Sequence, residues 1–70
     1  MAIDYNSLLT AEQKKALIEQ RVQQFAAEAY QHELNKQVAQ QIGDDTAIQQ
    51  ADAALATLET AIAVYQGEIA

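Results

Sequence analysis

Cysteine is absent from this sequence, and histidine occurs once, at position 32. The chain therefore cannot form a disulfide, a thiolate metal site or a histidine-rich metal cluster. A chain of 70 residues buries only about 60% of the surface that its unfolded form exposes, so small domains commonly depend on a disulfide, a metal or a second chain. Because the first is excluded and the second has few ligands, we expect oligomerisation to supply the missing stability.

Basic residues are scarce: four Lys or Arg stand against ten Asp or Glu, giving a net charge of −6. Binding to nucleic-acid phosphates or to an anionic membrane requires a basic face, so the composition argues against both partners. No apolar run approaches the roughly 20 residues of a transmembrane helix. Residues 1–10 have neither the basic nor the apolar segment of a secretory signal, so we expect a soluble chain made in the cytoplasm.

Proline is also absent, and the two glycines are isolated, so the sequence has no phosphate-binding loop and little to interrupt a helix. It predicts an all-α fold, an antiparallel two-helix hairpin forming one domain over residues 1–70. The predicted parts are an N-terminal arm over residues 1–9, a long helix over 10–42, a turn over 43–46 and a shorter helix over 47–69.

Capping signals support these boundaries. Residues 10–13 and 46–49 both fit a capping box, in which a Thr side chain and a Gln side chain satisfy free backbone N–H groups. Asp44 and Asp45 are competing N-caps for the second helix. Gly43 suits the left-handed residue that commonly ends a helix. So short a connection favours antiparallel helices.

The second helix carries an unbroken heptad ladder at alternating spacings of three and four: Ile48, Ala51, Leu55, Leu58, Ile62, Tyr65 and Ile69. A helix with such a ladder has to lie against another helix. The long helix has two apolar stripes instead of one. The first contains Ile18, Val22, Phe25 and Ala29, and the second contains Tyr30, Leu34, Val38 and Ile42. Each step of four residues rotates a stripe by about 40°, so one partner helix cannot cover both.

We assign the second stripe to the hairpin and the first to an external interface. The predicted hairpin core comprises Tyr30, Leu34, Val38, Ile42, Ile48, Leu55, Leu58, Ile62 and Tyr65. The predicted interface comprises Ile3, Tyr5, Leu8, Ile18, Val22 and Phe25. Two alternatives stay open: the Ala-rich surface simply remains exposed, and the arm packs on its own hairpin instead of on a neighbouring subunit.

His32 has Glu28 and Glu33 nearby in the sequence. Di-iron bundles use Glu-x-x-His at a spacing of three, and zinc metalloproteases need a second His where this chain has Lys36, so neither motif is complete. A surface histidine beside a helical glutamate explains the arrangement. The Ser and Thr residues lack a His–carboxylate pair. We therefore expect no catalytic residue, no metal, no cofactor and no enzymatic activity.

Three of the four positive charges lie in the first turns of the long helix, at Lys14, Lys15 and Arg21. Cations near a helix N-terminus oppose the helix dipole, at a cost of roughly a few tenths of a kcal/mol each. Pairs with Glu12 and Glu19 would offset this cost. Contact with the acidic second helix of a neighbouring copy is the alternative.

Residues 8–15 (LLTAEQKK) and 24–35 (QFAAEAYQHELN), followed by an Ala-rich closing helix over 51–69, resemble a group of small uncharacterised helical proteins encoded by tailed bacteriophages. The resemblance transfers no functional motif. It implies a component of the virion or of virion assembly, made in the cytoplasm of a bacterial host and incorporated in a virion.

The sequence thus predicts a non-enzymatic structural or assembly subunit that acts through helix–helix packing. Its expected partner is protein, either further copies of itself or a larger virion assembly. One alternative is a small binding module or assembly chaperone that caps a heterologous partner. A weaker alternative is a ferritin-type oxidase, which would require iron held with the help of His32.

Overall fold

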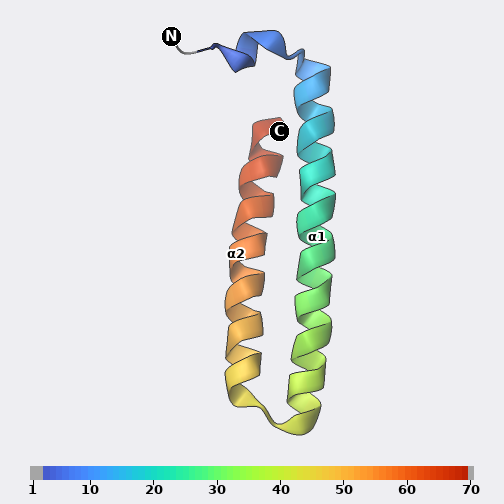
Figure 1. Cartoon of the computed structure of the whole chain (residues 1–70), viewed down its shortest axis with the longest axis vertical. Coiled ribbons are helices and arrows are strands. Elements are labelled where there is room, and N and C mark those ends of the chain that lie inside the picture. Colours follow the sequence, from blue (N-terminus) through green and yellow to red (C-terminus); the bar gives the residue numbers. More distant parts are fainter. Residues whose placement is uncertain (1–2, 70) are drawn as a thin grey trace.

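The structure, a computed structural model, describes residues 3–69, so the first two residues of the predicted arm lie outside the described part. Its elements are a short 3₁₀ helix, η1 (Tyr5–Leu8), and two α-helices, α1 (Ala11–Ile42) and α2 (Asp45–Ile69). α1 and α2 run antiparallel and pack against each other (Figure 1), and residues 3–69 contain no strand. The predicted all-α hairpin is confirmed.

Both ends of α1 are capped, the start by side chains and the end by backbone hydrogen bonds. At its start, the Gln13 N–H donates to the Thr10 Oγ1 (3.1 Å) and the Thr10 N–H donates to the Gln13 Oε1 (2.8 Å), which completes the predicted capping box. At its end, Gly43 adopts a left-handed conformation with φ 72°, which costs glycine nothing because it has no Cβ. The N–H groups of Gly43 and Asp44 both donate to the Ala39 carbonyl. The Asp44 bond is the one that defines a Schellman motif, and the Gly43 bond is that of the αL motif.

α2 begins two residues earlier than predicted, at Asp45 rather than at residue 47. The cap is Asp44, whose carboxylate accepts a hydrogen bond from the Ala47 N–H at 3.1 Å. Thr46 therefore lies inside the first turn and does not cap it. Because Gly43 has already reversed the chain, Asp44 is the next residue and the first that can serve as an N-cap.

The hairpin is a thin rod with extents of 52 × 25 × 16 Å. α1 is 32 residues long and α2 is 25, so the first turns of α1 project beyond the end of α2 (Figure 1). η1 continues past this end and packs on neither helix. Of the described residues only Ala39, Ala51 and Leu58 are buried, and no side chain is fully enclosed. The packing between two helices alone therefore gives the chain a small core.

The structure reverses the predicted roles of the two stripes on α1. The face of α1 that meets α2 is a heptad series spaced 4-3-4-3-4-3, here called the α1 seam: Ile18, Val22, Phe25, Ala29, His32, Lys36 and Ala39. All its members are buried or half-buried. The Phe25 ring packs on the Tyr65 ring of α2, with centroids 5.3 Å apart and planes tilted by 59°. Ile18, Val22 and Phe25 therefore belong to the hairpin and do not form an outer interface.

The predicted core stripe of α1 is, conversely, on the outside. Tyr30, Leu34, Val38 and Ile42 are all exposed, because a row of i+4 steps turns away from a straight partner helix while a 3-4 alternation keeps facing it. On α2, Leu58 is buried, and the other four predicted core residues are half-buried toward α1: Ile48, Leu55, Ile62 and Tyr65.

Candidate functional site

The most prominent exposed feature of the hairpin is an apolar row on α1, which we call the α1 ridge: Tyr30, Leu34, Val38 and Ile42. Their exposed fractions are 63%, 41%, 61% and 71%. Each side chain is four residues from the next, so the ridge winds obliquely over about 18 Å of helix. Leu34 and Val38 also line a shallow surface hollow with Gln37, Gln40 and Gln41. A continuous row of large exposed apolar side chains is typical of a surface that another protein covers.

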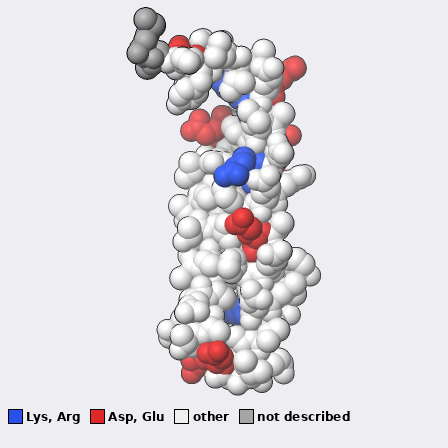
Figure 2. Space-filling model, viewed as in Figure 1, with Lys and Arg blue, Asp and Glu red and all other residues white. Residues whose placement is uncertain are grey.

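The α1 ridge is free of charge. Between Tyr30 and Ile42, α1 contains two charged residues, Glu33 and Lys36, and both line a groove toward Leu55 of α2. In Figure 2 the outer edge of the lower part of α1 is white, while blue atoms lie between the two helices and red atoms lie near the turn. Covering this surface would therefore remove no ionised side chain from water, a step that costs free energy unless the charge is paired.

α2 presents a different outer surface. It carries four acidic residues and no Lys or Arg, a net charge of −4, whereas α1 carries four acidic and four basic residues, a net charge of zero. The large apolar residues that α2 exposes are Val64 and Ile69. Two copies meeting through α2 would bring like charges together, which is destabilising.

One ion pair crosses the hairpin. The Lys36 Nζ lies 2.7 Å from the Asp52 Oδ1, and the two side chains are 31% and 52% exposed. A pair this accessible to water contributes about 0–1 kcal/mol. Lys36 is also a half-buried member of the α1 seam, so its apolar stem contributes to packing in addition to the ion pair.

The three N-terminal cations occupy distinct environments. Lys15 pairs with Glu19 at 4.0 Å. The Arg21 guanidinium lies 5.2 Å from the centre of the Phe25 ring and donates a hydrogen bond to the Gln24 Oε1 at 3.1 Å. Intrahelical contacts thus account for two of these charges, which agrees with the simpler of the two interpretations of the sequence.

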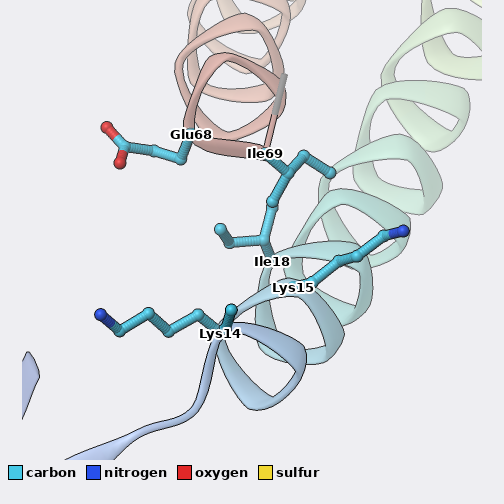
Figure 3. Close-up of a pocket in the computed structure, with 6 residues that line it drawn as sticks. Lys14, Lys15, Ile18, Glu68 and Ile69 are labelled. Atoms are coloured by element: carbon cyan, nitrogen blue, oxygen red, sulfur yellow. The ribbon is translucent and has the colours of Figure 1, made fainter. Parts of the chain in front are cut away.

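A hollow of about 320 Å³ lies where α2 ends against α1, lined by Ala11, Lys14, Lys15, Ile18, Glu68 and Ile69. Figure 3 shows Ile18 and Ile69 side by side between the helices, with Lys14 and Glu68 extending to one side and Lys15 to the other. Cations are favourable beside a helix C-terminus, so the α2 end offsets the unfavourable place of these lysines in α1. The hollow is explained by this stabilisation and shows no set of convergent polar groups.

His32 is half-buried on the α1 seam and is not a free surface residue. It lines a groove with Asn35, Ala47, Gln50 and Ala51. Between residues 3 and 69, no three His, Cys, Asp or Glu side chains are grouped to hold a metal ion.

The arm is exposed. Ile3, Tyr5 and Leu8, which we predicted to form part of an interface, all face outward. Within the arm, the Ser7 side chain and N–H donate to the Asp4 carbonyl at 2.9 and 3.2 Å. The alternative in which the arm docks on its own hairpin is not adopted, since η1 packs on neither α1 nor α2.

Comparison with known proteins finds no family model, no curated protein and no solved structure that matches this chain. Neither of the described helices has a stretch long and apolar enough to cross a membrane.

Sequence reasoning did not extend the first stripe of α1 beyond Ala29, and so it missed three members of the α1 seam: His32, Lys36 and Ala39. The signal was present in the spacing, because the 4-3 alternation that begins at Ile18 continues unbroken to Ala39. Residue type concealed it, since His and Lys are rarely counted as packing residues although both have apolar portions that can be covered.

Proposed function

We propose that this chain is a non-enzymatic structural or assembly subunit that acts through helix–helix packing, as a component of a bacteriophage particle. The observation that carries the proposal is the imbalance between its core and its surface. Among the described residues three are buried, while ten large apolar residues are exposed. Soluble monomers rarely expose contiguous apolar patches larger than a few hundred Å², and the largest patch on a protein is often an interaction site.

Size supports the same proposal. A two-helix rod without a disulfide has few internal sources of stability, and small domains of this kind commonly gain stability by associating with further helices. Antiparallel hairpins assemble readily into bundles of four or more helices, in which each additional helix covers a face that the hairpin leaves open. The virion assignment draws on the resemblance of residues 8–15 and 24–35 to phage-encoded helical proteins.

A second function is favoured by the arm. Ile3, Tyr5 and Leu8 are exposed beyond one end of the rod, at the far end from Gly43 (Figure 1). An apolar segment separate from the α1 ridge suits a small binding module or assembly chaperone, which would use the arm to cap a heterologous partner.

Solution mass distinguishes the two functions. We expect light scattering over a hundredfold range of concentration to show oligomers of the purified chain. A strictly monomeric helical species at every concentration would contradict a self-assembling subunit and would favour the binding module. Capture of a defined virion protein by the monomer, lost on changing Tyr5 to Asp, would then identify the arm as the contact.

A further inference from the structure

We propose that the α1 ridge is a self-association surface on which a second copy of this chain docks through its own α1 ridge, the two copies being related by a two-fold axis. The inference rests on the proposed function and deepens it by naming the surface, the partner and the packing geometry. Three independent features of the described residues carry it: the direction of the row, the distribution of charge and the exposed area.

The direction of the α1 ridge indicates which surface can pack on it. Side-chain rows four residues apart are inclined by about −26° to a helix axis, and two helices that interlock such rows cross at about −50°, the commonest packing class in globular proteins. The α1 ridge is a row of this kind, with three consecutive steps of four residues. α2 offers no such row outside, because its heptad ladder faces α1 and it exposes only Val64 and Ile69 as large apolar residues. The matching row is therefore the α1 ridge of another copy.

Charge favours the same contact. The core of a protein interface is depleted of charged residues, and the α1 ridge and its glutamine neighbours are uncharged. A two-fold contact through α2 would oppose two surfaces of net charge −4 each. Of the two symmetric contacts, the one through the α1 ridge brings no charged ridge residue opposite its copy, whereas the one through α2 opposes like charges.

The exposed area is adequate for a dimer of modest strength. Taking about 200 Å² for a fully exposed side chain of this size, the observed exposures give the α1 ridge on the order of 500 Å². Standard interfaces bury roughly 800 Å² per partner. Gln37 and Gln41 beside the ridge supply further contact, with amide groups that can hydrogen-bond across the interface. The expected product is a dimer that dissociates on dilution.

A pair of valines provides a matched test. Val38 lies in the α1 ridge and is 61% exposed, whereas Val64 lies on α2 and is 57% exposed. We would measure the association of wild type, V38E and V64E by sedimentation from about 1 to about 500 µM, the range for weak interfaces. V38E should weaken the dimer by at least about 100-fold because it buries carboxylates facing each other, while V64E should change it less than about threefold. Circular dichroism should report equal helicity for all three chains.

A mixing experiment tests the two-fold contact itself. V38E and V38K should each be monomeric alone, and an equimolar mixture should recover at least about tenfold in affinity, because opposite charges then meet across the interface. No recovery would overturn the ridge-to-ridge contact and would point to one in which the α1 ridge meets a different surface.

The outcomes separate this inference from the proposed function. A wild-type oligomer that V38E leaves intact overturns the inference alone. A wild-type chain that remains monomeric at the highest concentration overturns both self-association and the α1 ridge as its site. Equal weakening by V38E and V64E would indicate a head-to-tail contact between α1 and α2 of successive copies, which also contradicts the two-fold arrangement.

Discussion

At the scale of single residues, Asp44 connects the two helices because it forms hydrogen bonds with the end of α1 and with the start of α2. Its N–H donates to the Ala39 carbonyl at the end of α1, and its carboxylate accepts from the Ala47 N–H at the start of α2. The sequence predicted a turn at this place but left several N-caps possible. The choice among them follows from the left-handed conformation of Gly43, which reverses the chain so that Asp44 directly after it is placed to cap α2.

Replacing Asp44 with Ala should lower the free energy of unfolding by about 1 kcal/mol, the usual contribution of an N-cap side chain. Urea unfolding followed by circular dichroism at a fixed protein concentration measures the change. Asp45→Ala is the matched control, because it removes a neighbouring charge but keeps the cap, and it should cost about 0.5 kcal/mol or less. A larger loss for Asp45 than for Asp44 would contradict the assigned cap.

At the scale of elements, helix positions and the reversal at Gly43 were predictable because local signals specify them: a capping box, a C-terminal glycine and an absence of proline. The face of α1 that meets α2 was predicted incorrectly. Both stripes of α1 contain large apolar residues, so residue type did not separate them, and Tyr30 and Leu34 were placed inside and Phe25 outside. Strict 3-4 alternation is the better guide to a helix pair, since it alone keeps residues in line with a heptad partner.

Replacing Phe25 with Asp should destabilise the hairpin itself. The change removes the ring contact with Tyr65 and places a carboxylate between two helices, a loss of about 3 kcal/mol or more. Thermal unfolding at low concentration should show a large fall in Tm. Tyr30→Asp, at an exposed aromatic position of the same helix, should alter stability by about 0.5 kcal/mol or less. A larger loss of stability for Tyr30→Asp than for Phe25→Asp would indicate that Tyr30, not Phe25, belongs to the core.

At the scale of the whole molecule, the hairpin combines a small core with an uncharged apolar surface on α1 and an acidic surface on α2. The surface that covers the α1 ridge was not predictable from the sequence, because that requires knowing which side chains of α1 face outward once α2 has packed on it. The polarity of the two outer faces could be predicted, since net charge per helix follows from composition alone. The position of the α1 ridge could not, once its residues had been assigned to the interior.

If two copies associate through the α1 ridge, stability must depend on protein concentration. We expect the wild-type Tm to rise by about 3–8 °C for each tenfold increase in concentration, given the small enthalpy of a chain of this size. Scanning calorimetry or melting curves from micromolar to millimolar chain provide the measurement. In V38E the Tm should be independent of concentration, and an equal slope in both chains would argue against the α1 ridge as the source.

The tight connection at Gly43 and Asp44 also has a consequence for the order of folding events. Ala39 and Ala51, two of the three buried residues, flank this turn and are separated by a short stretch of chain, whereas Ile18 and Ile69 meet only after both helices are complete. Short loops close in about 10–100 ns, and the entropic cost of closure grows with loop length. We therefore expect packing between α1 and α2 to begin at the turn and to extend progressively toward the open end of the hairpin. Opening under thermal fluctuation should follow the reverse path, so amide exchange should be fastest near Ile69 and slowest near Ala39.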